Sequence, residues 1–509
     1  MMQHLPALPL LIPLLAGALM LLVERRGIVA QRVVAWLSMA AMLVAAAFLL
    51  HQADQGPLLV YLLGDWPARL GIALMVDRVN ALLVLTSALL AVAALLYACA
   101  GWDRRAPHFH ALFQLQLAGL NGAFLTGDLF NLFVFFEVVL IASYGLLLSG
   151  GRGLRMRAGL HYVVFNVMAS SLFLVALGLL YGMTGTLNMA EMALRIANAP
   201  PQDMAMLRAA SGILLVVFCA KAALLPLYLW LPETYSRAPA AVVALFTIMT
   251  KVGVYAVLRV YSLLFGEGSG ALDGWAWDWL LPAGIITLVL ASLGVLASRS
   301  LRGTVSYLVI VSAATLFIAF ALQTPAAVGA GLYYLVHSTF VTAALFLIVD
   351  LVRRQRGPLG DRLDQAGPMR GTTMLGLLFL VAAVSVAGLP PLSGFFGKIA
   401  LLAAVPPGQV ALVWTTVLGT SLMQLVALSR VGSQMFLRAQ PWAGADMPAP
   451  PRKLEIAAAI VLLAYGMALT LAAGPALRYA QDAGAQVLAP AAYIEQVRAT
   501  QPLLRTPSP

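Results

Sequence analysis

The sequence has 509 residues, of which 62% are apolar and only 10% are charged, and its mean hydropathy is +0.92. These values exclude an ordinary soluble domain and indicate an integral membrane protein. The net charge of +11 could suit a nucleic-acid partner in a soluble protein. Here the gathering of basic residues in loops on one side of a membrane explains the charge better, so we expect no nucleic-acid partner.

Fourteen apolar runs follow one another along the chain, and most have the roughly 18 to 25 residues that a helix needs to cross a bilayer. In chain order they lie near residues 4–23, 29–51, 74–99, 108–126, 129–149, 157–182, 207–240, 241–264, 277–297, 303–322, 326–350, 371–405, 409–437 and 454–473. The runs lack the alternating pattern of barrel strands. We therefore predict an all-α integral membrane protein with about fourteen transmembrane helices.

The basic residues set the expected topology. The first run has no lysine or arginine before its apolar core and is followed by Arg25 and Arg26, so we expect a retained helix rather than a cleavable signal peptide. Of the 31 lysines and arginines, twenty fall in loops on one side of the predicted bundle and eight, Arg259 among them, on the other. The positive-inside rule then predicts a multi-pass protein of the bacterial cytoplasmic (inner) membrane, with both termini outside the cytoplasm.

The three remaining basic residues, Lys221, Lys251 and Lys398, lie inside apolar runs, although the chain has only four lysines. A charged lysine at the centre of a membrane helix costs about 2.5 to 3.5 kcal/mol. A desolvated lysine can give up its proton near neutral pH, whereas arginine stays charged. We therefore expect these lysines to handle protons. The alternative is that they are structural partners of buried carboxylates.

Two further titratable residues lie well inside apolar runs. Glu137 is the only carboxylate deep in a run and is a counter-ion for one of the lysines, either in a functional pair or in a static pair that locks two helices. His337 is the one histidine well inside a run in the C-terminal half. Its imidazole suits a proton relay, but a hydrogen-bonded packing residue is the alternative.

Prolines interrupt the seventh and twelfth runs beside two of the lysines. Pro226 follows Lys221 by five residues, and Pro390 and Pro391 precede Lys398. Proline breaks the helical hydrogen-bond pattern, and irregular backbone at membrane depth is tolerated only where it is buried in protein or lines a watery cavity.

The two breaks are 164 residues and five predicted helices apart. Because five is odd, helices four to eight and nine to thirteen would form inverted repeats, which is the architecture of ion-coupled transporters. The expected divisions are 1–107 (first three helices), 108–264 (first repeat), 265–437 (second repeat) and 438–509 (last helix and tail).

Three long stretches resemble the antiporter-like subunits shared by respiratory complex I, membrane-bound hydrogenases and Mrp cation/proton antiporters. They are GDLFNLFVFFEVVLIASYGLLL, AKAALLPLYLWLPETYSRAPAAVVALFTIMTKVGVYAVLR and GLPPLSGFFGKIALL. Within that superfamily the chain is most similar to the D-subunit family of Mrp (Mnh or Pha) antiporters. The grounds are the opening PLLIPLLAGALMLL, the fourteen runs, the tail QVLAPAAYIEQV and the lack of a long C-terminal extension.

The resemblance implies a role for each membrane-embedded titratable residue. Glu137 and Lys221 match the family's charge pair, Lys251 the central lysine, His337 the histidine of the eleventh helix and Lys398 the terminal lysine of the broken twelfth. Some relatives carry a further lysine at the position of Val341, so the resemblance implies that water and hydroxyls bridge the relay there.

The expected function is proton conduction along this relay, coupled to extrusion of Na⁺, K⁺ or Li⁺ and carried out together with other Mrp-type subunits. A proton-pumping subunit of a complex I-type oxidoreductase or an energy-converting hydrogenase is one alternative, and a non-conducting scaffold is another. We expect a transporter subunit rather than an enzyme. Cys99 and Cys219 suggest neither a disulfide nor a metal, and no motif implies a cofactor.

Overall fold

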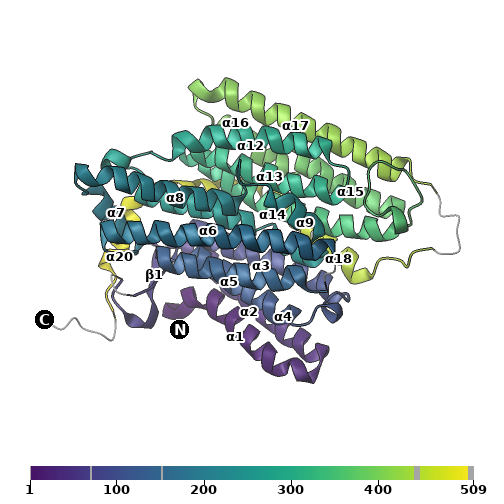
Figure 1. Cartoon of the computed structure of the whole chain (residues 1–509), viewed down its shortest axis with the longest axis horizontal. Coiled ribbons are helices and arrows are strands. Elements are labelled where there is room, and N and C mark those ends of the chain that lie inside the picture. Colours follow the sequence, from purple (N-terminus) through teal and green to yellow (C-terminus); the bar gives the residue numbers. More distant parts are fainter. Residues whose placement is uncertain (1, 69–70, 151–152, 441–446, 503–509) are drawn as a thin grey trace.

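The computed structural model describes residues 2–68, 71–150, 153–440 and 447–502. Over these residues the chain is mostly helical (Figure 1). The elements are α1 (Leu8–Val23), α2 (Ile28–Gln55), β1 (Leu59–Leu62), β2 (Ala73–Val76), α3 (Arg78–Cys99), α4 (Phe109–Leu125), α5 (Leu129–Leu148), α6 (Leu154–Thr184), α7 (Met189–Ala197), α8 (Met204–Ala222), α9 (Trp230–Arg237), α10 (Ala240–Phe246), α11 (Met249–Leu264), α12 (Trp277–Ala297), α13 (Leu301–Ala321), α14 (Pro325–Gln355), α15 (Thr372–Ala387), α16 (Ser393–Ala403), α17 (Val410–Gly432), α18 (Lys453–Leu471), α19 (Ala473–Val487) and α20 (Pro490–Ala499).

Within the described ranges, twelve helical segments are long and apolar enough to cross a membrane. They confirm the predicted helical membrane fold. The two other predicted runs are also helical but shorter, since α4 has 17 residues and the run 371–405 is divided into α15 and α16, of 16 and 11 residues. The number of fourteen crossings, the inverted repeats and the four divisions stay predictions.

The long helices lie side by side, and the chain advances across the molecule from α1 at one edge to α17 at the other (Figure 1). The C-terminal helices do not continue this order. Instead α18 and α19 return to the middle, where both contact α3 and α14. The first and last thirds of the sequence therefore share one core.

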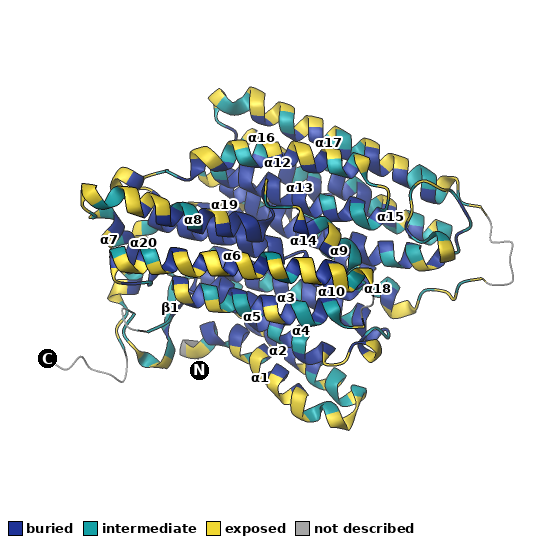
Figure 2. Cartoon of the chain, in the orientation of Figure 1, coloured by how far each residue is buried: buried dark blue, intermediate teal, exposed yellow. Residues whose placement is uncertain are grey.

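The centre of the bundle consists of α11, α13 and α14, and the outer helices expose apolar side chains (Figure 2). In the most apolar windows of segments Ala240–Leu264 and Pro325–Gln355, 100% and 94% of the residues are buried, against 28% in Pro407–Leu437. A helix that is buried on all sides contacts protein rather than lipid. Polar groups on α11 and α14 can therefore find protein partners.

The structure differs from the predicted elements at both ends of the chain. Residues 74–76, assigned above to the start of the third run, belong to strand β2, which pairs antiparallel with β1. The helix begins only at Arg78, because the side chain of Asp77 caps it by accepting from the backbone of Asn80. The tail after α18 was expected without a helix, but it forms α19 and α20.

Helix α19 is too polar to be recognised as an apolar run, and it docks on α14 through small residues. A Cβ at Gly329 would lie 2.6 Å from the Cα of Gln481, and one at Gly484 would lie 2.7 Å from the carbonyl oxygen of Pro325. The two backbones can approach this closely only because both positions are glycine. The sequence of either helix alone does not reveal a contact that requires a glycine on both.

Candidate functional site

The first helix break separates α8 from α9 and contains Pro226. Helix α8 ends at Ala222, and Ala223 takes the left-handed conformation with φ of 59°. The indole of Trp230 donates to the carbonyl of Ala220 (3.1 Å), and the amide of Leu225 donates to the hydroxyl of Thr287 (3.0 Å). Side chains therefore satisfy backbone groups that the break leaves open.

Lys221 lies in the last turn of α8 and is only 6% exposed. Its Nζ has no hydrogen-bond partner among the described residues and lies 4.9 Å from the centre of the Phe136 ring. Aromatic faces attract cations, so this contact can hold the ammonium without fixing it. Lys221 is thus the least restrained of the five predicted residues.

The neighbouring residue on α5, Glu137, accepts a hydrogen bond from Ser170 of α6. Glu137 lies within electrostatic range of Lys221, but no direct contact joins the carboxylate to Nζ in the described part of the chain. The structure therefore brings the two members of the predicted charge pair near each other without forming a hydrogen-bonded ion pair.

Lys251 lies at the centre of the bundle on α11 and is completely buried. Its Nζ donates to the hydroxyl of Ser312 on α13, at 2.8 Å. Two residues further on, a Cβ at Gly253 would lie 2.6 Å from the amide nitrogen of Ala222 and 2.9 Å from the carbonyl carbon of Lys221. Glycine at this position lets α11 pack directly against the first break.

His337 lies in the middle of α14 and is 1% exposed. Its Nδ1 is 2.9 Å from the hydroxyl of Ser393, the first residue of α16. On the other side of the ring, a Cβ at Gly394 would lie 2.9 Å from Nε2. Both ring nitrogens therefore face the segment that follows the second break. The imidazole also lies within electrostatic range of Lys251 and Lys398.

Lys398 lies on α16 and reaches back across the second break, which contains Pro390 and Pro391. Its Nζ donates to the carbonyls of Val386 (3.2 Å) and Ala387 (2.9 Å) and to the hydroxyl of Ser421 (2.9 Å). The two carbonyls belong to the last turn of α15, where a helix carries unpaired acceptors and a partial negative charge. The broken helix itself therefore provides the counter-charge for this lysine.

Serine hydroxyls form a pattern that the sequence analysis missed. Glu137, Lys251, His337 and Lys398 each contact one, while the Nζ of Lys221 has none among the described residues. The four hydroxyls belong to Ser170, Ser312, Ser393 and Ser421. A hydroxyl can donate and accept at once, so each one can stay bonded whether its partner holds a proton or not. Serine is common in buried helices, and nothing in the sequence marks these four.

Val341 on α14, where the resemblance implied a bridge of water and hydroxyls, is buried and 5% exposed. Two hydroxyls lie close to it in sequence on the same helix, where Thr342 donates to the carbonyl of Ser338 and Thr339 to that of Leu335. Thr247 reaches across from the end of α10 to the carbonyl of Thr339, at 3.3 Å. Hydroxyls are therefore present at the level where the resemblance implied them.

Helix α11, which carries Lys251, also carries one member of a buried ion pair that was not predicted. Arg259, assigned above to a loop, lies inside α11 and is 5% exposed, because the helix continues to Leu264. It pairs with Asp77, and the hydroxyl of Tyr255 lies beside it on Asn80 (2.9 Å). Pairing offsets the cost of burying both charges. The residue therefore does not count towards a loop on that side of the membrane.

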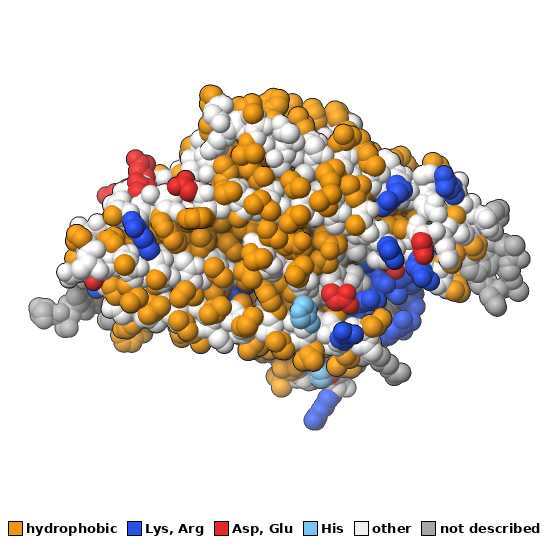
Figure 3. Space-filling model, turned by 45° about the horizontal axis from the view of Figure 1, so that its top comes forward, with side chains coloured by type: hydrophobic (Ala, Val, Ile, Leu, Met, Phe, Trp, Pro, Cys, Tyr) orange, Lys and Arg blue, Asp and Glu red, His pale blue; other side chains and the backbone are white. Residues whose placement is uncertain are grey.

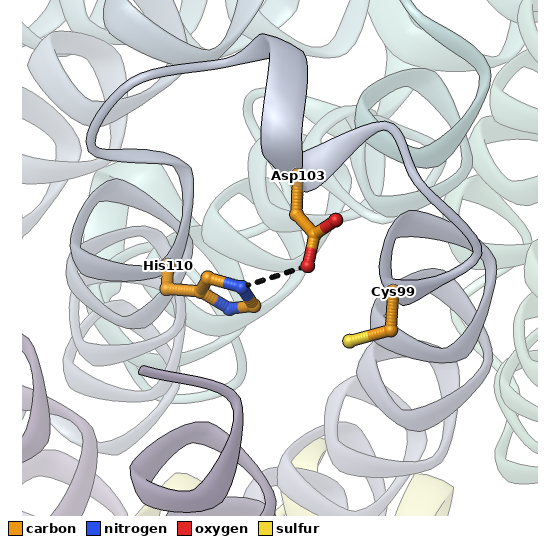
Figure 4. Close-up of side chains that lie close together, drawn as sticks. All are labelled: Cys99, Asp103 and His110. Atoms are coloured by element: carbon orange, nitrogen blue, oxygen red, sulfur yellow. Dashed lines mark hydrogen bonds and ion pairs between the residues drawn. The ribbon is translucent and has the colours of Figure 1, made fainter. Parts of the chain in front are cut away.

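Cys99, Asp103 and His110 form a compact group whose ligand-type atoms lie within 4.8 Å of one another (Figure 4). Burial alone would raise the pKa of Asp103, but hydrogen bonds from His110 and Arg32 lower it to about 2. Arg32 donates to both carboxylate oxygens, at 2.7 and 2.9 Å, and His110 Nε2 lies 3.2 Å from one of them. Because a guanidinium already occupies both oxygens, we interpret this group as an ion-pair network that joins α2 to α4. Cys99 and Cys219 are both free and buried.

Lysine and arginine side chains gather at one end of the molecule, at the right in Figure 3, while the surface between the ends is mainly apolar. This is the distribution expected of a protein that crosses a membrane with one basic side. The long helical segments that carry Glu137, Lys251 and His337 run from this basic end towards the opposite end of the molecule (Figure 1).

Comparison with known proteins gives a consistent result over nearly the whole chain. A family model described as "NADH:quinone oxidoreductase/Mrp antiporter, TM" matches residues 126–424. The D subunit of a probable K(+)/H(+) antiporter of Rhizobium meliloti is 40% identical, covering 97% of this chain and 98% of the relative. The D subunit of a Na(+)/H(+) antiporter of Alkalihalophilus pseudofirmus is 34% identical, covering 97% and 99%.

Solved structures agree with these relatives. A chain of the Mrp complex from Dietzia sp. DQ12-45-1b matches with a TM-score of 0.88 and 27% identity, covering 98% of this chain and 99% of that one. A chain of respiratory complex I from Thermus thermophilus matches with a TM-score of 0.75 and 22% identity, covering 98% and 100%, and so shares the fold. The chain belongs to the family of Mrp-type cation/proton antiporter D subunits.

Proposed function

We propose that this chain is the proton-conducting subunit of a multisubunit Na⁺/H⁺ or K⁺/H⁺ antiporter. Protons would move at mid-membrane along a relay of five residues, Glu137, Lys221, Lys251, His337 and Lys398, coupled to extrusion of a monovalent cation. The observation that carries the proposal is the nature of their contacts. Among the described residues, each group bonds to hydroxyls or carbonyls, or to nothing, rather than to a fixed opposite charge.

These contacts argue against the purely structural alternative. A lysine whose role is to lock two helices would be held in a close ion pair, as Arg259 is by Asp77. Lys221 has no such partner in the described ranges, and Lys251 and Lys398 bond to neutral groups. Charge repulsion between neighbouring ammonium groups, which low dielectric strengthens, can then drive a proton from one group to the next.

The two helix breaks are the proposed places where the relay meets water. At the second break, Lys398 lines a cavity of about 360 Å³ between α16 and α17, together with Gly388 and Ser421. A cavity beside irregular backbone supports a half-channel at this position. At the first break, Lys221 lies in the last turn of the preceding helix, α8, where its Nζ, which has no partner among the described residues, would receive or release the proton.

Further observations support the topology, the partners and the exchanged ion that we propose. We place the arginine-rich end in the cytoplasm and both termini outside it, in the inner membrane, by the positive-inside rule. The relatives are named as subunits of K(+)/H(+) and Na(+)/H(+) antiporters, and identities of 40% and 34% favour these over complex I at 22%. We therefore expect other Mrp-type subunits beside this chain and Na⁺, K⁺ or Li⁺ as the exchanged ion.

The test is cation-dependent proton transport in everted vesicles that carry the whole complex, with Na⁺ and K⁺ compared. Lys221→Ala and Glu137→Ala should each abolish nearly all of it. Lys453→Ala is the matched control, because Lys453 is exposed and is the one lysine outside the apolar runs. Intact transport in Lys221→Ala, in a complex assembled at the normal level, would refute the relay. Vesicles with this chain alone should show no antiport.

A further inference from the structure

A cavity of about 140 Å³ at the arginine-rich end plays no part in the proposed relay. It lies among residues of the α3–α4 loop, α6, α10, α13, α14 and the start of α18. Six arginines line it, namely Arg105, Arg155, Arg302, Arg353, Arg354 and Arg452. Asp350 and Glu455 are the acidic residues of the lining. Arg302 is paired outside the lining with Asp361 (3.0 Å), so the cavity has an excess of three positive charges that no carboxylate of the lining or of this pair offsets.

The two carboxylates neutralise only part of the lining. Asp350 is bonded by Arg353 (2.8 Å), Arg354 (3.1 Å) and the hydroxyl of Tyr97 (2.8 Å), and Glu455 is bonded by Arg354 (3.0 Å). These bonds use most of the acceptor capacity of both groups. The other arginines of the lining therefore need hydrogen-bond acceptors other than these two carboxylates.

Three other arginines of the lining have no carboxylate partner within the described ranges. Arg155 donates to the carbonyls of Ser149 and Arg237, and Arg452 donates to a carbonyl at the end of α3. The side chain of Arg105 makes no contact of this kind with any described residue. Such an arrangement leaves several guanidinium N–H groups able to bind one further acceptor.

Two buried donors on the lining are also unsatisfied. The Nε1 of Trp102 and the Nε of Arg353 have no hydrogen-bond partner in the part of the chain that the structure describes. Neither group can accept a hydrogen bond, so each needs an acceptor. Buried donors without a partner are rare in folded proteins and indicate an acceptor that the polypeptide does not provide.

We infer that this cavity binds an anion that carries a phosphate group. Guanidinium groups are planar forks that match phosphate oxygens, and a phosphate offers acceptors only. The volume far exceeds the roughly 10–15 Å³ that one water requires. The phosphate has two sources at a membrane surface, the headgroup of an anionic phospholipid or soluble inorganic phosphate, and the same donors would recognise either.

The bound anion would stabilise a link between helices. Tyr97 on α3, Asp350 and Arg354 on α14, and Glu455 on α18 form one network at the cavity wall. An anion that bonds Arg353 and Arg105 would reduce the repulsion among the arginines around this network. Helix α14 also carries His337, so the site is joined through a buried helix to the centre of the bundle.

The experiment compares thermal unfolding of the whole complex, purified in a neutral detergent, with the double variant Arg105→Gln/Arg353→Gln. Inorganic phosphate is one arm, with chloride at matched ionic strength. The other arm uses phosphatidylglycerol against phosphatidylcholine nanodiscs. The matched control is Arg299→Gln/Arg438→Gln, which removes two exposed arginines outside the cavity.

We expect phosphate or phosphatidylglycerol to raise the Tm of the wild type and of the control. In the double variant the apparent affinity should fall about tenfold or more. A rise with phosphatidylglycerol alone identifies a lipid headgroup, and a rise with phosphate identifies a soluble anion. Absence of both rises, or equal rises in the double variant, would overturn the inference. Arg105→Gln alone gives a second reading, because this side chain has no partner among the described residues whose loss could disturb folding.

Discussion

The Nδ1 of His337 and the hydroxyl of Ser393 lie 2.9 Å apart, which joins the middle of α14 to the first residue after the second helix break. A movement of α16 would therefore change the contact of the imidazole directly. Lys398 lies on the same short helix and bonds to the other side of the break, so one segment of eleven residues carries both the partner of His337 and a second proposed relay group.

This contact predicts graded effects of two substitutions. His337→Ala removes a titratable group and should abolish nearly all antiport by the complex. Ser393→Ala removes only the hydroxyl that orients the ring, so the initial rate should fall by about tenfold, as for loss of one hydrogen bond of about 1.5 kcal/mol. Ser171→Ala is the control, because among the described residues that serine bonds only to its own helix. Equal rates in Ser393→Ala and the control would contradict a positioning role.

Substitutions of Lys398 can separate the effect of its positive charge on stability from its proposed role in proton transfer. Lys398→Arg keeps a cation on the carbonyls of α15, so the complex should assemble and unfold near the wild-type temperature. Arginine stays protonated, however, and antiport should be lost. Lys398→Ala should lose both antiport and thermal stability, because it also leaves the acceptors at the end of α15 without a donor. Vesicle antiport and thermal unfolding measure the two effects, and full transport by the arginine variant would rule out proton transfer at this site.

Gly253 predicts an effect on assembly. Gly253→Ala places a Cβ 2.6 Å from the backbone nitrogen of Ala222, and backbone at a packed helix break cannot move aside easily. Overpacking of this kind typically costs about 1–3 kcal/mol. Gly178→Ala is the matched control, because nothing lies within 4 Å of a Cβ there. The amount of complex recovered from membranes should fall for the first variant only, and equal yields would show that α11 is not packed as described.

Asp103 predicts a pH dependence of stability. Its pKa is lowered to about 2 in the folded protein, against roughly 3.9 in an unfolded chain. The stabilisation is therefore fully present above about pH 4 and is lost as the pH falls towards 2. Asp103→Asn should lower the Tm at pH 7, and the difference from wild type should shrink between pH 4 and 2. A difference that is constant over this range would mean that the charge of Asp103 does not matter.

The five residues of the proposed relay could be chosen from the sequence because a titratable group inside an apolar run is costly and therefore rare. Pro226, Pro390 and Pro391 likewise marked breaks that the structure contains. The serine partners could not be chosen, because serine is inexpensive in a buried helix and its role depends on the neighbouring helix it faces. Whether Glu137 bonds directly to Lys221 was also beyond the sequence, since it depends on side-chain rotamers.

Helix α19 and strand β2 show a second limit. Residues 473–487 have too few apolar side chains to suggest a buried helix, and their contact with α14 depends on Gly329 and Gly484, which lie 155 residues apart. Residues 74–76 are apolar and lie next to a membrane helix, so hydropathy alone extends the predicted helix through them. Only the cap at Asp77 separates the two elements.

The return of α18 and α19 to the centre has a consequence for how the protein is made. Helix α14 is covered on part of its surface by these two helices, which are the last long ones to be synthesised. While the ribosome is still translating residues 453–487, the segment that carries His337 has no cover on that side and is exposed to lipid or to membrane chaperones. The core of this protein can therefore close only near the end of translation, and a chain that stops before α18 would leave its central helix open to proteolytic quality control.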